Sequence, residues 1–282
     1  MIAATLLLLV AVGPADTTLR LPRGGTVEIE AGFRAVVITT GSDDQVTVTG
    51  ASAERDGDRI TVEAMSPFRR RGGETLRVTV PGWAIVEVTV INGNLDVERV
   101  PDSFTADVVN SAVVTRGGSG AMHLSAATGS ITVNDFAGKQ LEVESLTGPI
   151  TINGATGRVQ ASAVNDPLFL RNVRSSAVDA ASVNGRIEWQ GEFLPGGRYR
   201  FESHNGAIDL RLPTDVSARM HISTFMGSFG SGIPATTNGR SRREEPTSEG
   251  GREFTAVYGS GSAEVWVETF HGGIRVRDRG ES

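Results

Sequence analysis

The chain has 282 residues, of which 35 are glycine, none is cysteine and only 6% are aromatic. Frequent glycine together with many valine, isoleucine and threonine residues is typical of short strands joined by tight turns, and the absence of cysteine excludes disulfide bonds. The net charge of −6, with acids and bases interspersed, argues against a nucleic-acid-binding protein, whose surface is normally strongly basic.

Residues 1–15 are typical of a secretory signal peptide. An unbroken run of apolar and small residues, 2–12, precedes Gly13-Pro14-Ala15, a small-residue pattern that signal peptidase cuts. The run is shorter than the roughly 20 residues that a membrane span needs. We therefore expect a chain that is exported to the periplasm, the cell surface or the medium, begins at Asp16 and has no transmembrane segment. The alternative is that this run is a buried first strand.

Residues 16–82 contain short segments of alternating apolar and polar residues, which are typical of strands. The segments lie at 27–29, 35–39, 46–48, 60–62 and 76–80. Because they do not follow the register of the repeats that come next in the chain, we expect this region to form an N-terminal β cap.

Residues 83–277 contain nine copies of one repeat. Each copy has a reference position, and successive reference positions lie 18 to 21 residues apart, except for a final spacing of 45. The nine reference residues are Gly93, Ser111, Gly129, Gly148, Asp166, Gly185, Gly206, Gly227 and Gly272.

Apolar residues recur at fixed offsets from each reference position: seven and five residues before it, and two and four residues after it. Eight of the nine residues two positions before it are also apolar, His204 being the exception. The intervening residues are mostly polar. Such alternation predicts two strands per repeat, each with one buried and one solvated face. We expect the first strand to end about five residues before the reference position.

The repeats predict an all-β, single-stranded β-solenoid, a parallel β-helix that is right-handed by analogy with most parallel β-helices. Nine coils at about 4.8 Å each would give a rod of roughly 43 Å. A meander of β-hairpins is the rival topology, because Asn-Gly is a strong hairpin signal. Repeated residue types in one register favour the solenoid, since the second turn of each repeat varies in sequence.

The turns at the reference positions are expected to be structural. Stacked asparagine side chains can hydrogen-bond to one another along a solenoid and so satisfy their amide groups. The turn residues singled out are Asn92, Gly93, Gly129, Gly148, Asn184, Gly185, Asn205 and Gly206.

The long final spacing predicts a polar loop insertion at 232–254. This insertion contains Arg240, Arg242 and Arg243, and a second basic run, Arg69 to Arg71, lies in the N-terminal region. Either run could bind an anionic envelope glycan or lipid headgroup. The charged tail, 278–282, is expected to close the end of the rod in water.

One set of motifs resembles a known family. These are the ladder of Asn-Gly-x-Ile-x-Val motifs, the Val80-Pro81 strand exit, and a Gly-Ser-Gly-x-Ala-x-Val block that runs from Gly259 to Ile274. Over roughly residues 25–277 the chain is similar to the bacterial putative-adhesin family of β-strand-repeat proteins, a domain of unknown function. The resemblance implies a β-helical protein of the cell envelope, and it brings no catalytic residues.

Catalytic candidates are few. Glu188 and Asp209, with Arg186 nearby, are the best pair of acids that adjacent coils offer for a polysaccharide hydrolase or lyase. The four histidines have no zinc-ligand spacing, so no metal or cofactor is expected. The sequence thus favours a non-enzymatic, adhesin-like interaction module that binds an envelope glycan or protein. The alternatives are a polysaccharide-acting enzyme and a scaffold that joins rods end to end; the oligomeric state stays open.

Overall fold

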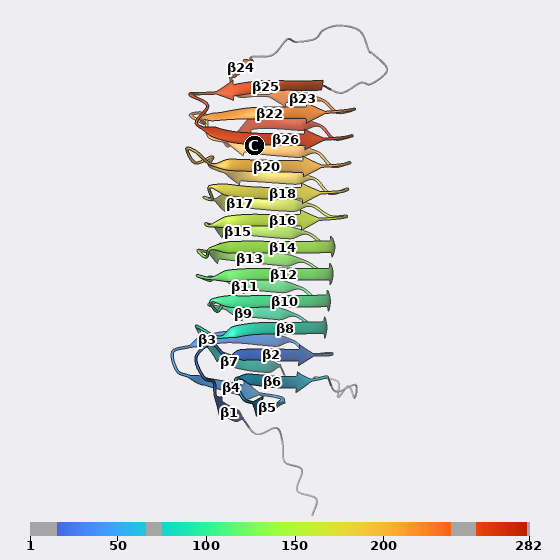
Figure 1. Cartoon of the computed structure of the whole chain (residues 1–282). Coiled ribbons are helices and arrows are strands. Elements are labelled where there is room, and N and C mark those ends of the chain that lie inside the picture. The colour runs from blue at the N-terminus through green and yellow to red at the C-terminus, as the bar shows by residue number, and fades with distance from the viewer. Residues whose placement is uncertain (1–15, 66–74, 238–251, 281–282) are drawn as a thin grey trace, which may run out of the picture.

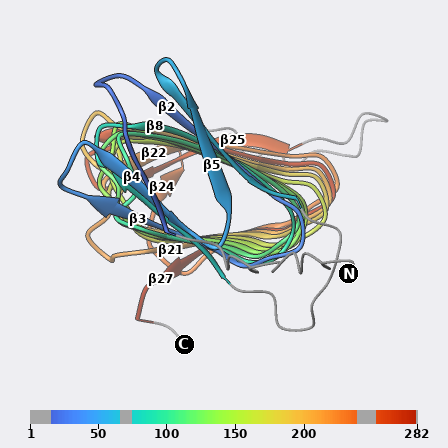
Figure 2. The same ribbon diagram turned by 90° about the horizontal axis from the view of Figure 1, so that it is seen from below.

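The computed structural model describes residues 16–65, 75–237 and 252–280. These residues form a rod of stacked strands, shown upright in Figure 1, and Figure 2 shows from one end that two sheets enclose a flattened tube. Over the described ranges the secondary structure is strands and turns. None of these residues belongs to a helix with the length and apolar character of a membrane span.

The strands form two long sheets. Along the rod, sheet A consists of β1 (Thr17–Arg20), β4 (Gln45–Thr49), β7 (Leu76–Pro81), β3 (Val36–Gly41), β9 (Leu95–Glu98), β11 (Val113–Arg116), β13 (Ile131–Phe136), β15 (Ile150–Ala155), β17 (Leu168–Val173), β19 (Ile187–Gly191), β21 (Ile208–Leu212), β27 (Ile274–Asp278) and β23 (Phe229–Ser231). From the opposite end, sheet B consists of β24 (Thr236–Thr237), β25 (Arg252–Tyr258), β22 (Ala218–Thr224), β26 (Ala263–Thr269), β20 (Arg198–Ser203), β18 (Ala177–Ser182), β16 (Arg158–Ala163), β14 (Gln140–Thr147), β12 (Ala121–Thr128), β10 (Ser103–Asn110), β8 (Ile85–Asn92), β2 (Thr26–Ala31), β6 (Arg59–Ala64) and β5 (Ser52–Asp56).

Each coil is one strand of sheet B, a turn, the next strand of sheet A and a return connection. Neighbouring coils pair in parallel, as Leu124 beside Val143 in sheet B and Ile131 beside Ile150 in sheet A illustrate. All nine predicted repeats pair in this way. The solenoid arrangement is therefore confirmed and the hairpin meander is wrong. The hand of the coil stays a prediction.

The core is the space between the two sheets. The predicted apolar positions point into it: Leu141, Ile150 and Ile152 are fully buried, as are the larger Trp189 and Phe201, whose rings lie 5.3 Å apart. The polar neighbours face outward, because successive side chains of a strand point to opposite faces. Four sheet B strands, β8, β10, β12 and β14, extend beyond the predicted end and reach the residue just before the reference position.

The prediction that residues 26–80 lie outside the register of the repeats is wrong for four of the five segments. Val27 pairs with Val86 and Val36 pairs with Leu95, so β2 and β3 form a complete coil in register. β6 and β7 form another, because β6 pairs in parallel with β2 and β7 with β3. The repeat pattern did not reveal these two coils for two reasons. The first has Arg34 at the reference position, and in the second, residues 66–74, which are not described, lie between β6 and β7.

The coils do not stack in the order of the chain, contrary to expectation. At the C-terminal end, β26 lies between β20 and β22, and β27 lies between β21 and β23; in Figure 1 the red β26 is visible between its neighbours. The predicted role of the charged tail at the end of the rod is therefore wrong, and Arg279 donates a hydrogen bond back to the carbonyl of Gly191. The N-terminal end is arranged likewise, since β2 lies between β6 and β8.

Antiparallel strands lie at both ends of the rod. β5 pairs with β6 and β4 with β7 at one end, and β25 pairs with β22 at the other. The segment predicted as a loop, 232–254, thus includes the start of β25, all of β24 and the buried side chain of Ile233. Residues 238–251 lie outside the described part of the chain.

Candidate binding groove

The predicted basic binding runs cannot be placed. Arg69, Arg70, Arg71, Arg240, Arg242 and Arg243 all lie outside the described residues. Their role in binding stays a prediction.

The candidate catalytic pair is part of an ion-pair network on the outer face of sheet A. Glu188 and Asp209 pair on adjacent strands, as the repeat predicts. The carboxylate of Glu188, a residue only 8% exposed, lies 3.5 Å from the guanidinium of Arg186 and 3.8 Å from that of Arg211. Asp209 lies 3.6 Å from Arg277. Both carboxylates are engaged with arginines, an arrangement typical of a structural network.

The histidines each contact a carboxylate or an aromatic ring. His123 lies 3.3 Å from Glu142, and His221 lies 3.0 Å from Glu264. His204 stacks on Phe270. Across the described ranges, no three histidine, aspartate or glutamate side chains gather in a way that could hold a metal ion.

The turns at the reference positions are held by hydrogen bonds along and within the coils. Asn205 donates to Asn184 at 2.8 Å, and Asn184 donates to Asn165 at 3.1 Å. Within a coil, the hydroxyl of Ser203 accepts a hydrogen bond from the backbone N–H of Gly206. The asparagines thus satisfy one another, which supports a structural role for this row.

The side chains two positions before the reference residues form an outward-facing line on sheet B, which we call the outer apolar row. In stacking order the row contains Ile91, Val109, Ala127, Leu146, Val164, Val183, His204, Phe270 and Phe225. Leu146 is 53% exposed, Val183 44% and Val109 43%. The sequence groups these residues with the core, whereas the structure places them in solvent.

Three aromatic rings stack at the C-terminal end of the outer apolar row. Phe270 lies between His204 and Phe225, with ring centroids 4.9 and 4.7 Å away and ring planes within 8° of parallel. Both faces of Phe270 are therefore covered by its neighbours, and its edge is the part that faces outward. This stack is possible because β26 is inserted between β20 and β22.

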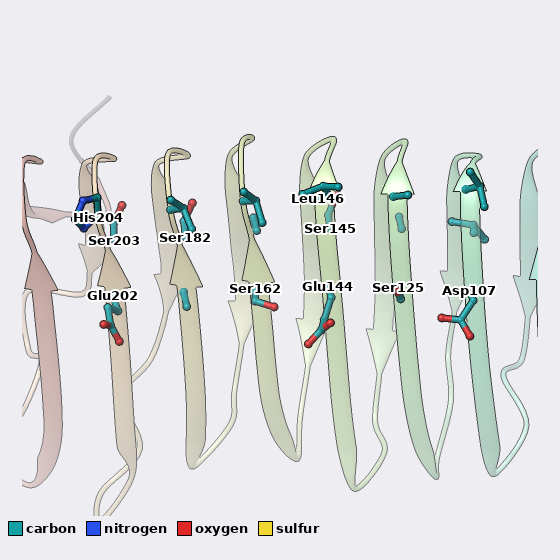
Figure 3. Close-up of a pocket in the computed structure, with 18 of the residues that line it drawn as sticks. Asp107, Ser125, Glu144, Ser145, Leu146, Ser162, Ser182, Glu202, Ser203 and His204 are labelled. Atoms are coloured by element: carbon teal, nitrogen blue, oxygen red, sulfur yellow. The ribbon is translucent and has the colours of Figure 1, made fainter.

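A second row, four positions before the reference residues, lies beside the first on the same face. We call it the acidic row, because its charged members are Asp107, Glu144, Glu202 and Glu268, and it contains no lysine or arginine. The members between them are the small residues Ser125, Ser162 and Ala181. Figure 3 shows the carboxylates of Asp107, Glu144 and Glu202 in one line, parallel to the line that contains Leu146 and His204.

The two rows line an open groove of about 800 Å³ that runs along the rod. Its lining extends from Thr89 on β8 to Glu268 on β26 and thus crosses eight neighbouring strands. The groove is apolar on one side and acidic on the other. Such a shape suits an elongated partner that lies across many coils, because repeat proteins present extended surfaces of this kind. Along the groove we find no pairing of a nucleophile with a base.

The sequence contained a signal for the groove that simple hydrophobicity missed. Offsets of seven, five and three residues share one parity, whereas an offset of two has the other. Since side chains alternate between faces along a strand, an apolar residue two positions before the reference must face outward. The parity of the offset, rather than the type of residue, identifies the outer apolar row.

Several solved structures have a similar fold. A "putative adhesin" from Parabacteroides merdae ATCC 43184 has a TM-score of 0.52 at 9% identity, covering 94% of this chain and 97% of that one. A "putative lipid binding protein" from Parabacteroides distasonis ATCC 8503 has a TM-score of 0.51 at 10% identity, covering 94% and 97%. A "putative adhesin" from the same organism has a TM-score of 0.50 at 11% identity, covering 93% and 96%. At these identities the likeness shows the fold alone.

Sequence comparison identifies the family. No curated protein matches the chain. The family model described as Toastrack DUF4097 matches residues 25–277, which includes every coil of the rod and the groove on sheet B. The chain therefore belongs to the Toastrack DUF4097 family.

Proposed function

We propose that this protein is a non-catalytic, adhesin-like binding module of the bacterial cell envelope, and that its groove on sheet B binds another envelope protein. The observation that carries the proposal is the outer apolar row. Large apolar side chains such as Leu146, Val183 and Phe225 are exposed in one line on a rigid sheet, and a contiguous exposed apolar patch marks an interaction site.

The export of the chain rests on its N-terminal sequence. The apolar run at 2–12 and the small residues that follow it support secretion, although they lie outside the described residues. The family match and the adhesin names of two proteins with this fold agree with a place in the envelope.

A protein partner fits the groove better than a glycan. Sugar rings bind proteins by stacking on exposed aromatic faces, and the faces of Phe270 are covered by His204 and Phe225. A protein partner would bury apolar side chains against the outer apolar row, and burial of apolar surface contributes about 25 cal/mol per Å².

Site-specific photo-cross-linking tests the proposal. A photoreactive residue is placed at Leu146 in the groove, or at Thr132 on the outer face of sheet A, and the chain is incubated with the envelope fraction of the producing bacterium. We expect a protein adduct from Leu146 that unlabelled chain competes away and that Val183→Glu abolishes. Thr151→Glu, a matched charge on sheet A, should leave the adduct unchanged.

Each other result contradicts part of the proposal. Glycan adducts from Leu146 would overturn the class of partner. Adducts from Thr132 alone would move the site to sheet A, and no adduct from either position would overturn the binding function.

A further inference from the structure

We propose that the groove on sheet B binds a cationic amphipathic α-helix that lies along the rod. This inference rests on the proposed function and adds the chemistry of the bound segment. Three features of the groove lead to it: its charge, its apolar row and the spacing of its carboxylates.

The charge of the groove favours a basic partner. Asp107, Glu144 and Glu268 form no ion pair with any described residue. Glu202 pairs with Arg200 at 2.9 Å, but both side chains are about half exposed, so the pair contributes little and can exchange. A line of carboxylates in which, among the described residues, only Glu202 has an ion-pair partner attracts a positively charged segment and fixes its position.

The same charge disfavours two other occupants. An anionic membrane surface would be repelled by the acidic row. A second copy of this chain, packed groove to groove, would bring two acidic rows together, and like charges placed opposite one another in an interface cost several kcal/mol.

The outer apolar row requires that the partner also be apolar on one side. Leu146, Val183 and Phe270 lie in line beside the carboxylates and present no hydrogen-bonding groups. An amphipathic helix meets both demands, because its apolar face can lie on this row while Lys or Arg at its border reach the acidic row.

The spacing of the carboxylates distinguishes a helix from an extended chain. Glu144 lies two coils beyond Asp107, Glu202 three coils beyond Glu144, and Glu268 one coil beyond Glu202. At about 4.8 Å per coil these steps are roughly 10, 14 and 5 Å. Cations 7, 11 and 4 residues apart stay on one side of a helix, within about 60° of one another, and lie about 10.5, 16.5 and 6 Å apart along it, within about 2 Å of each step.

An extended chain matches only the longest of these steps. Its side chains on one face recur every 6.6 to 6.8 Å or so, so two repeats fit the three-coil step, whereas the one-coil and two-coil steps fall between repeats. The groove crosses eight strands from β8 to β26, or about 34 Å, and a helix of that length has about 22 residues.

A synthetic helix provides the test. The probe is a dye-labelled peptide of about 22 residues with leucine on one face and lysine at its border, and its binding to the full chain is followed by fluorescence anisotropy. Two control peptides have the same residues in scrambled order, or glutamate in place of lysine. We expect only the amphipathic cationic peptide to bind, and we expect it to gain helical circular dichroism when it does.

Matched protein variants assign the binding to the acidic row. The triple variant Glu144→Gln, Glu202→Gln, Glu268→Gln should bind the peptide about tenfold more weakly, since each exposed ion pair contributes a fraction of a kcal/mol to about 1 kcal/mol. The control variant Asp43→Asn, Glu98→Gln, Asp215→Asn removes three exposed acids away from the groove and should bind as the wild type does.

Cross-linking to the same peptide tests the orientation. Photoreactive residues at Val109, Leu146 and Val183 lie two coils apart in succession. For a helix along the rod, the cross-linked peptide positions should advance by about six or seven residues at each step, compared with about three for an extended segment.

The outcomes separate this inference from the proposed function. Equal binding of the scrambled peptide, no loss in the acidic-row variant, or steps of three residues would overturn the helix. If no peptide binds while Leu146 still cross-links to an envelope protein, the inference fails and the proposed function stands. If neither occurs, both fail.

Discussion

The glycine at the turn out of sheet B leaves no space for a side chain. A Cβ atom added to Gly206 would overlap with the carbonyl oxygen of Gly185 in the neighbouring coil, and one added to Gly272 would overlap with that of Gly206. Neither backbone has a positive φ angle in the left-handed region. These two glycines are needed because adjacent coils approach closely, rather than because of a positive φ angle.

We predict that Gly206→Ala lowers the free energy of unfolding by about 2–3 kcal/mol, since the coils must move apart to admit the methyl group. The melting temperature should fall by roughly 5–10 °C. Gly230→Ala is the matched control, because no atom lies within 4 Å of its Cβ position, and it should be close to neutral. Equal melting temperatures for the two variants would contradict the close approach of the coils.

Both tyrosines of the chain are buried near the C-terminal end of the rod. The hydroxyl of Tyr199 donates a hydrogen bond to the carbonyl of Ser175 at 2.6 Å and accepts one from the N–H of Leu194 at 2.7 Å. The hydroxyl of Tyr258 lies 3.0 Å from that of Ser231. Burial raises the pKa of Tyr199 and of Tyr258 above the ordinary value of about 10, although the hydrogen bond from Leu194 to Tyr199 and that between Ser231 and Tyr258 oppose the shift.

The raised pKa values predict a loss of stability in alkali. As the pH rises, the unfolded chain loses its phenol protons near pH 10, before the folded chain does. The contribution of the tyrosines to the free energy of unfolding is therefore complete below pH 10 and is lost as the pH rises through the folded pKa values. The chain has a single lysine, Lys139, and arginine stays charged in this range. The tyrosines should therefore dominate the effect.

The measurement is the urea midpoint between pH 8 and pH 11. The double variant Tyr199→Phe, Tyr258→Phe should be less stable at pH 8, by about 1–3 kcal/mol for each buried partner left unsatisfied. It should also lose most of the decline above pH 10. An unchanged decline in the double variant would assign the alkaline transition to other groups.

At the scale of the strand, the sequence predicts which residues share a face. Leu141, Ile150 and Ile152 lie where the repeat places core residues, because each strand alternates between a buried and a solvated face. The predicted core was wrong where a residue was assigned to it because it is apolar, although its offset from the reference position places it on the outer face, as at Leu146 and Val183. The Asn-Gly turns were predictable, whereas the groove depended on a row that looked like core.

The order of the coils could not be predicted from the repeat. Every coil offers the same parallel edges, so the apolar pattern of β26 fits equally well on β22 or between β22 and β20. The first coil was missed for a different reason, since Arg34 occupies the place of the usual turn residue. The spacing from Val27 to Val36 is nevertheless that from Val86 to Leu95, so the register was present in the sequence.

The inserted coil predicts the effect of a C-terminal truncation. A chain that ends at Ser262 lacks β26 and β27, which separate β22 and β23 from the rest of the rod. We expect β22 and β25 to detach and become sensitive to protease, while residues 26–65 and 75–212 stay protected, because each coil of a solenoid contacts only its neighbours. Limited proteolysis with mass spectrometry measures this.

Complementation provides the control. A peptide of residues 259–282 added in trans should restore the protection of β22, because it supplies both missing strands. If β22 stays protected in the truncated chain without the peptide, then β22 and β23 can pack directly on β20 and β21, and the inserted coil is not required.

At the scale of the whole molecule, the two faces of the rod differ in charge. Sheet B carries the acidic row beside the outer apolar row, whereas arginines such as Arg186, Arg211 and Arg277 surround the two acids on the outer face of sheet A. Eleven coils at about 4.8 Å each give a rod of about 50 Å. The two faces of one rod therefore suit different partners: a basic one on sheet B and a more acidic one on sheet A.

The ends of the rod bear on whether copies join end to end. Sheets end in short strands: β23 has three residues, β24 has two and β1 has four. β5 is longer, but its sequence places the exposed Glu54, Arg55 and Asp56 on the edge. Short or charged edge strands oppose the pairing of one sheet with another.

We therefore predict that the rods stay separate in solution, and that the mass measured by light scattering does not change over a wide range of protein concentration. The double variant Glu54→Val, Asp56→Val removes both acids from β5 and puts two β-branched residues on its edge, and its mass should rise with concentration. Arg55→Lys keeps the charge of the edge and should behave as the wild type does. A wild-type mass that grows with concentration would favour the end-to-end scaffold, because the edges would then be open to pairing despite their charge and length.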